Sequence, residues 1–206
     1  MRKYFYIIIS ILGFIIVTLA VFVASEFYAG KWESERLLKV SLKDTSGKPW
    51  RISNLKNKLG IIYFGYTYCP DICPTALGDL INALAGMGHD QHLFQPIFIS
   101  IDPGRDTQQV IKEYILHFDR NLLGLTGTPT QLKSFTFNIG STYAIQKKDA
   151  DDQDYTVNHT IGYFMISSTG QKIRLPIRNN PQDLRKIILK VKNRMLENIF
   201  SELKID

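Results

Sequence analysis

The chain has 206 residues, of which 45% are hydrophobic, so it can bury the core of one ordinary domain and is not expected to be disordered. Its net charge of +6 is spread along the chain and lacks the basic and aromatic motif of a nucleic-acid binder, a class that we exclude. Two cysteines are too few for a disulfide-rich scaffold and must serve one local purpose, which is one disulfide, one redox pair or one metal site.

The N-terminal segment has the length and composition of a membrane-spanning helix. Tyr4 to Ala24 is almost entirely apolar and follows Arg2 and Lys3. We therefore expect residues 1–25 to form a transmembrane anchor, with a signal peptide cleaved near Ala24 as the alternative. Positive residues before the span orient the N-terminus to the cytoplasm. No Arg- and Ser-rich transit peptide is visible, which predicts a single-pass protein of a bacterial inner membrane whose soluble domain lies in the periplasm.

The segment 26–36 mixes charged and aromatic residues without a period and is expected to be a linker, which leaves 37–206 as the soluble domain. This domain opens with two alternating stretches, Lys39–Leu42 and Trp50–Leu55, separated by turn-forming residues. The pattern predicts an antiparallel hairpin.

A β-α-β unit follows the hairpin. Gly60–Gly65 and Gln95–Ile101 have strand composition, and Cys73–Gly86 between them has apolar residues at helical spacing. A crossover of this kind makes the two strands parallel. Asp106, with Gln109 three residues later, resembles a capping box and predicts the start of the next helix.

The rest of the domain is read as alternating strands and helices. The expected elements are a strand at Leu122–Leu125, a helix at Thr128–Phe137, a strand at Thr142–Ile145, a hairpin of Gly162–Ser167 and Lys172–Leu175, and a last helix from Pro181. This succession predicts an α/β sandwich with a central mixed sheet, and the position of the cysteines after its first parallel strand suggests the thioredoxin-like arrangement.

Cys69 and Cys73 lie in the turn Gly65–Pro74, between the first parallel strand and its helix. Free N–H groups and the positive dipole end at a helix start favour thiolate, so we expect a lowered cysteine pKa. The C-x-x-x-C spacing allows the sulfurs to bond each other or to hold one ion. A purely structural disulfide would close too small a loop to stabilise the domain much.

Among the four histidines, His159 is the candidate for a third ligand, because it lies just before a predicted strand. We expect His89, His92 and His117 to face solvent. Two thiolates with one imidazole form a low-coordinate set that suits Cu(I), whereas structural zinc sites normally have four protein ligands.

Four blocks of sequence carry a resemblance to a known family. In chain order they are Gly65–Pro74, Asp102–Asp106, Leu125–Thr128 and Val157–Thr160, and the similarity extends over about residues 37 to 195. These blocks resemble the signatures of the Sco (SenC) family. The resemblance implies a membrane-anchored thioredoxin-fold protein that binds copper, as Cu(I) and with Cu(II) left open, and helps to assemble the copper centre of cytochrome c oxidase. It also implies that Cys69, Cys73 and His159 are the copper ligands and that the oxidase's copper-bearing subunit is the partner.

One position departs from the family pattern, since Asn158 stands where an aspartate usually precedes the histidine. A hydrogen-bonding role remains open to this side chain, but a charged one does not. Asp71 and Asp102 are the remaining acidic candidates near the site, with ordinary turn or capping roles as the alternative. The acidic stretch Asp149–Asp154 is interpreted as a solvated hairpin rather than a docking surface.

Two functions compete on these residues. The first is copper delivery by a protein that is not an enzyme. The second is thiol-disulfide exchange, with Cys69 as the attacking thiolate and Cys73 as the resolving thiol, which would reduce the cysteines of the same oxidase subunit. His159 discriminates between them, because dithiol exchange does not need it. The cysteine turn lacks the Pro-x-x-x-Thr-x-x-Cys pattern of peroxiredoxins.

Overall fold

The computed structural model describes residues 2–149, 152, 154–177 and 180–203. It contains a seven-stranded sheet in the order β2-β1-β5-β4-β3-β8-β9 and a two-stranded sheet of β6 and β7. The strands are β1 (Leu42–Asp44), β2 (Pro49–Trp50), β3 (Leu59–Gly65), β4 (Phe94–Ser100), β5 (Leu123–Thr126), β6 (Tyr143–Gln146), β7 (Thr156–His159), β8 (Tyr163–Ile166) and β9 (Lys172–Leu175). The helices are α1 (Arg2–Lys39), α2 (Ile72–Ala85), α3 (Gln108–Leu116), α4 (Pro129–Ile139) and α5 (Pro181–Leu203), with short 3₁₀ helices η1 (Ile52–Leu55) and η2 (Gly88–Leu93).

The central sheet is mixed, as predicted. β3 pairs in parallel with β4, and β4 with β5, whereas β8 pairs antiparallel with the other edge of β3 and β1 pairs antiparallel with β5. The parallel β3–α2–β4 crossover and the β8–β9 hairpin are both confirmed. In the hairpin turn Gly170 has a φ of 88°, a left-handed conformation that glycine adopts without strain.

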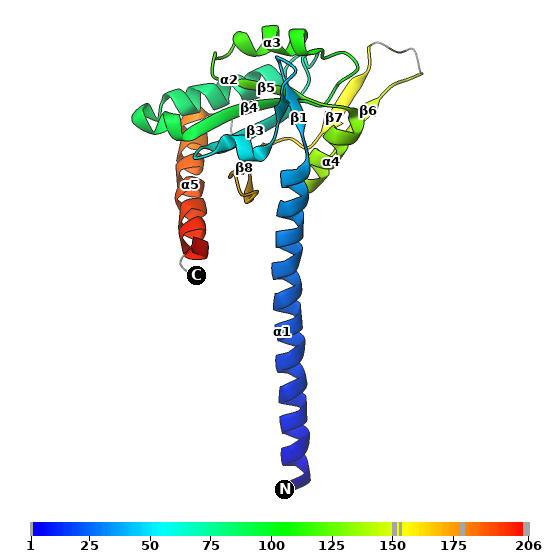
Figure 1. Cartoon of the computed structure of the whole chain (residues 1–206), viewed down its shortest axis with the longest axis vertical. Coiled ribbons are helices and arrows are strands. Elements are labelled where there is room, and N and C mark those ends of the chain that lie inside the picture. The colour runs from blue at the N-terminus through cyan, green and yellow to red at the C-terminus, as the bar shows by residue number, and fades with distance from the viewer. Residues whose placement is uncertain (1, 150–151, 153, 178–179, 204–206) are drawn as a thin grey trace.

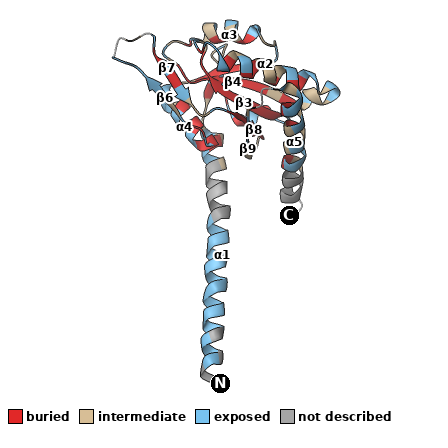
Figure 2. Ribbon diagram, turned by 180° about the vertical axis from the view of Figure 1, so that it is seen from behind, coloured by how far each residue is buried: buried red, intermediate tan, exposed pale blue. Residues whose placement is uncertain are grey.

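The core lies around β3 and β4, where Figure 2 shows the densest buried colouring. Every residue of β3 is buried, as expected for a strand with a neighbour on each side and helices on its faces. α2 and α5 pack against one another, α3 contacts β5, and the last part of α1 contacts α4. A short turn connects the C-terminal end of β3 to the start of α2, and the two cysteines lie in this turn and in the first turn of the helix.

The predicted first hairpin has the right position but the wrong boundaries. Lys39 ends α1 rather than beginning a strand, and β1 starts at Leu42. After β2 the chain turns into η1, not a longer strand, because Ile52 and Leu55 are both buried and a 3₁₀ helix places residues three apart on one side.

The predicted capping box at Asp106 is also wrong. Thr107 caps α3 instead, since its side-chain oxygen accepts a hydrogen bond from the backbone N–H of Val110 at 3.3 Å. Asp106 is 1% exposed and turns into the domain. The next helix begins as predicted, with Thr128 and Gln131 forming the capping box of α4.

The N-terminal region forms one unbroken helix that leads away from the domain in Figure 1. The segment 26–36, predicted as a linker, lies inside α1, which agrees with its lack of proline and its good helix formers. Among the residues that the structure describes, no helix has both the length and the apolar character needed to span a bilayer. The division into 1–25, 26–36 and 37–206 and the membrane span stay predictions.

Candidate metal centre

The two cysteines lie on either side of the start of α2. Cys69 belongs to the turn after β3, where its backbone N–H donates to the carbonyl of Tyr66 at 3.2 Å, and Cys73 is the second residue of α2. Both are free thiols, and Cys69 lies close enough to raise the pKa of the Cys73 thiol. Cys69 is 8% exposed and Cys73 is fully buried. The turn thus presents one outer and one inner sulfur.

Gly65 makes room for the inner sulfur. A β-carbon at this position would lie 3.0 Å from Cys73 Sγ and 3.0 Å from a ring carbon of Phe98. Such distances are too short for a side chain without movement of its neighbours. The glycine at the end of β3 therefore allows the Cys73 thiol to pack directly against the strand.

The acidity of Cys73 differs from the expectation. Burial raises the pKa of this thiol to about 12, and the hydrogen bond with the Cys69 thiol acts in the same direction. The expected lowering by the helix start is wrong here, because the loss of water around a fully buried sulfur outweighs the dipole. A ligating thiol must be deprotonated, so binding of a cation at Cys73 has to displace this proton.

Tyr63 connects the cysteine pair to His159. Its side chain is fully buried on β3, and its hydroxyl has no hydrogen-bond partner of good geometry among the described residues. Burial raises the pKa of this hydroxyl, and the thiols of Cys73 and Cys69 raise it further. The Tyr63 ring and Cys73 Sγ also both lie against the α-carbon of Gly65, since a β-carbon there would come within 3.2 Å and 3.0 Å of them. The edge of the Tyr63 ring meets the His159 ring with centroids 6.1 Å apart. One aromatic side chain therefore lies between the inner sulfur's surroundings at Gly65 and the imidazole of His159.

His159 ends β7 and pairs across the small sheet with Tyr143 of β6. Its Nδ1 lies 3.1 Å from the carbonyl oxygen of Thr160. Because a carbonyl oxygen only accepts, Nδ1 carries the proton and Nε2 keeps a lone pair that can bind a metal. Burial lowers the pKa of His159, which favours the neutral, ligating form of the imidazole.

The three predicted ligands do not form a closed cluster. Within the described part of the chain, no group of three or more His, Cys, Asp or Glu side chains is arranged to hold a metal ion. The structure brings Cys69 and Cys73 close together and places His159 edge-on to the Tyr63 ring, outside any closed cluster with the two sulfurs. An ion held by the two sulfurs would require the imidazole to move toward them.

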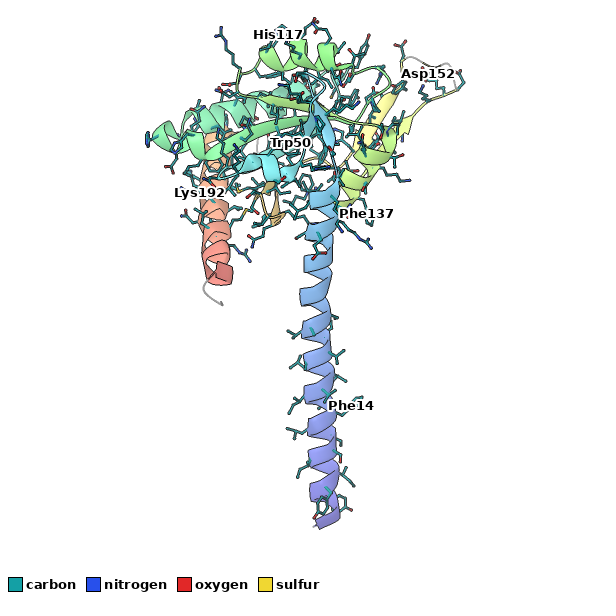
Figure 3. The ribbon with its side chains drawn as sticks, viewed as in Figure 1. Phe14, Trp50, His117, Phe137, Asp152 and Lys192 are labelled. Carbon is teal, nitrogen blue, oxygen red and sulfur yellow. The ribbon has the colours of Figure 1, made fainter. Side chains whose placement is uncertain are left out.

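The other histidines are exposed, as predicted. His89 and His92 lie in η2, beyond the end of α2 that is distant from the cysteines, with ring centroids 5.0 Å apart. His117 follows α3 on the outer surface, where Figure 3 labels it.

The two acidic candidates have ordinary partners or none. Asp71 is exposed, and its side chain makes no capping hydrogen bond to α2. Asp102 is fully buried. One of its carboxylate oxygens lies 2.6 Å from Nε of Arg105, and the other accepts a hydrogen bond from the hydroxyl of Tyr155 at 2.5 Å. Neither carboxylate belongs to a metal-binding group in the described residues.

Sequence reasoning missed Tyr63, Arg105 and Tyr155. The strand pattern of Gly60–Gly65 includes Tyr63 without marking it, although a hydroxyl within a buried strand that leads to two cysteines is a usable signal. β7 was missed as well, because the pattern of the four residues Thr156–His159 is too short to be distinguished from a loop.

Comparison with known proteins identifies what this arrangement is similar to. The family model described as SCO1/SenC matches residues 38–195. A mitochondrial protein SCO2 of Saccharomyces cerevisiae is 41% identical over 140 residues, which is 68% of this chain and 46% of the yeast protein. A SCO2-like protein of Rickettsia prowazekii is 37% identical over 133 residues, or 65% of each chain. The match thus spans less than two thirds of the length of either relative.

Solved structures give the same picture. ScoI of Arabidopsis thaliana with copper bound superposes with a TM-score of 0.68 at 33% identity, covering 75% of this chain and 96% of that one. ScoI of Bradyrhizobium japonicum with copper bound gives a TM-score of 0.65 at 32% identity, covering 73% and 96%.

Proposed function

The chain belongs to the SCO1/SenC family, and from this premise we propose that it is a copper-binding protein that delivers copper to the copper centre of cytochrome c oxidase. Its thioredoxin-like α/β fold with a mixed central sheet matches the solved Sco structures. We assign copper the role of cargo, held at Cys69, Cys73 and His159 and passed to the oxidase's copper-bearing subunit.

The observation that carries the proposal is the buried cysteine pair near Tyr63, whose ring also makes an edge contact with the ring of His159. Two soft sulfurs and one imidazole nitrogen suit Cu(I) and offer too few ligands for a structural zinc site. The buried surroundings that raise the pKa of the Cys73 thiol also keep competing water ligands away from the inner sulfur. An imidazole that does not belong to a closed cluster with the sulfurs suits a site that must release its ion.

A second candidate function, thiol-disulfide exchange, is favoured by the unequal exposure of the sulfurs. Cys69 is the outer thiol and Cys73 the inner one, with exposed fractions of 8% and 0%. An attacking thiol must reach its substrate, whereas a resolving thiol attacks a bond already formed beside it. Oxidation of a partner's dithiol or reduction of its disulfide would then transfer two electrons through the Cys69–Cys73 pair.

The discriminating experiment is metal analysis with X-ray absorption on the reduced full-length chain. We expect about one copper per chain with two sulfur neighbours and one nitrogen, and His159→Ala should lose the nitrogen and transfer copper differently to a thiolate-rich acceptor. The exposed His117→Ala is the matched control and should behave as wild type. A reduced chain that takes up no copper but exchanges disulfides would favour the second function.

We further propose that α1 anchors the chain in a bacterial inner membrane, with the remaining domain in the periplasm. The described apolar side chains from Tyr4 to Val23 support this, because they are at least half exposed and contact no other element of the protein, as Phe14 illustrates in Figure 3. Alkaline phosphatase fused after Asp206 should be active in a bacterial host. A well-expressed but inactive fusion would contradict this topology.

A further inference from the structure

A short loop, Asp102–Asp106, lies between the cysteine turn and the strand that carries His159, and we call it the bridging loop. Both of its aspartates are buried, with exposed fractions of 0% and 1%. Asp106 accepts hydrogen bonds from the backbone N–H and the hydroxyl of Thr67, at 2.9 Å and 2.6 Å. Asp102 accepts one from the hydroxyl of Tyr155 at 2.5 Å. One end of the loop therefore binds the cysteine turn, and the other binds the residue just before β7.

Arg105, in the same loop, contacts residues on both sides of it. Its Nε donates to the second oxygen of Asp102 at 2.6 Å. Its guanidinium carbon lies 3.5 Å from the centre of the Tyr155 ring and 4.9 Å from that of Tyr68, the residue before Cys69. A planar cation so close to aromatic faces is attracted to both, and more strongly where water is excluded.

β7 depends on such contacts for its position. It pairs with β6 alone, and these two strands form a sheet that is separate from the central one. No backbone ladder among the described residues therefore ties His159 to β3 or to the cysteine turn. Tyr155, just before the strand, and Val157 within it are buried side chains, 6% and 4% exposed. Of these two, only Tyr155 makes a hydrogen bond to a buried charge.

We propose that Asp102, Arg105 and Tyr155 form a tether that holds the His159 strand against the cysteine turn, and that the strength of this tether sets how firmly the imidazole takes part in copper binding. The inference rests on the proposed function in that it takes His159 as a ligand. The three are positioning residues, since they act through His159. A tight tether favours retention of copper, and a loosened one favours release.

The first arm of the test needs no metal and uses Tyr155→Phe, which removes one hydroxyl and keeps the ring. Hydrogen–deuterium exchange of the full-length apo chain should show the amides of Thr156–His159 exchanging about ten- to a hundredfold faster, the range for losing a hydrogen bond to a charged group. The control Tyr163→Phe removes a fully buried hydroxyl, which donates to the carbonyl of Ala76 at 2.7 Å, and should leave the exchange of β7 unchanged. Unchanged exchange in Tyr155→Phe would overturn the tether.

The second arm is a double-mutant cycle on Cu(I) affinity, measured by competition with a chelator. Tyr155→Phe should weaken copper binding about tenfold in the wild-type background and not at all in His159→Ala. Arg105→Lys, which keeps the charge but loses the planar stack, should behave in the same way. An equal loss in both backgrounds, or no loss in either, would overturn the link between the tether and the imidazole.

The two arms separate failure of this inference from failure of the proposed function. If His159→Ala alone binds copper as wild type does, His159 is not a ligand and the copper part of the inference falls with it. If His159→Ala weakens binding while Tyr155→Phe does not, the ligand assignment stands and the tether is wrong.

Discussion

Replacing Asp106 by alanine should destabilise the domain severely, because this side chain connects three elements. Its carboxylate accepts two hydrogen bonds from Thr67 in the cysteine turn and one from the hydroxyl of Ser100 at the end of β4, the last at 2.5 Å. Ser100 is fully buried and Thr67 partly so. Alanine leaves the Ser100 hydroxyl without an acceptor where water does not reach it.

The size of the effect follows from these three bonds. A hydrogen bond to a charged group contributes about 1.5 to 3 kcal/mol, and a buried donor left unpaired costs a similar amount. Burial raises the pKa of Asp106 despite its hydrogen bonds, so part of the gain is offset by the cost of burying the charge. We therefore expect a loss of about 3 to 5 kcal/mol, a large fraction of the stability of an ordinary domain.

Urea unfolding followed by tryptophan fluorescence measures this loss. A Trp32→Phe background leaves Trp50, which is 7% exposed, as the only reporter. Asp106→Asn, which keeps an acceptor oxygen, should lose less than Asp106→Ala. The exposed Asp183→Ala, which breaks only a surface ion pair with Lys186, should lose less than about 1 kcal/mol. A loss for Asp106→Ala no greater than that of Asp183→Ala would refute the reasoning.

Three further predictions concern the inner sulfur, a surface ion pair and the redox state. Gly65→Ala should overpack against Cys73, cost about 1 to 3 kcal/mol and speed the reaction of the thiols with a disulfide reagent. The control Gly78→Ala, in open space on α2, should be neutral or stabilising. Lys192 holds the pKa of Asp90 below its ordinary value, so Lys192→Gln should lower the melting temperature at pH 7. This difference should shrink as pH falls below the ordinary aspartate pKa and vanish once Asp90 is protonated in the folded chain, because the pair stabilises only while Asp90 is ionised; a constant difference would contradict it. The chain with Cys69 and Cys73 oxidised to a disulfide should retain no copper, and retention equal to that of the reduced chain, by mass spectrometry, would disprove thiolate ligation.

The cysteine turn and the crossover around it could be predicted because their signals are local. Ile61 to Phe64 form a continuous β-branched and aromatic run, and Leu77, Leu80 and Leu84 recur at helical spacing. Strand, turn and helix can therefore each be recognised from a few consecutive residues. The structure agrees with that order to within one or two residues at each boundary.

The arrangement around His159 could not be predicted in the same way. The hydrogen bond from Tyr155 to Asp102 joins residues 53 apart in the chain, and no periodicity reports such a contact. In the sequence, Asp106 and Thr107 are both suitable residue types for the N-cap of α3. Only the hydrogen bonds of the Asp106 carboxylate to Thr67 and Ser100 show that Asp106 serves another purpose. Local propensity is a weak guide wherever a polar side chain satisfies a distant partner.

The junction between α1 and the domain has a practical consequence for protein engineering. Leu37 of α1 is completely buried, and the hydroxyl of Ser34 donates to the carbonyl of Gly170 in the β8–β9 turn at 3.5 Å. A recombinant version that starts at the predicted domain boundary would keep Leu37 as a frayed first residue and lose the helical turn that covers Gly170. A start several residues before Ser34 preserves both contacts and gives Leu37 a full turn of helix to hold it in place.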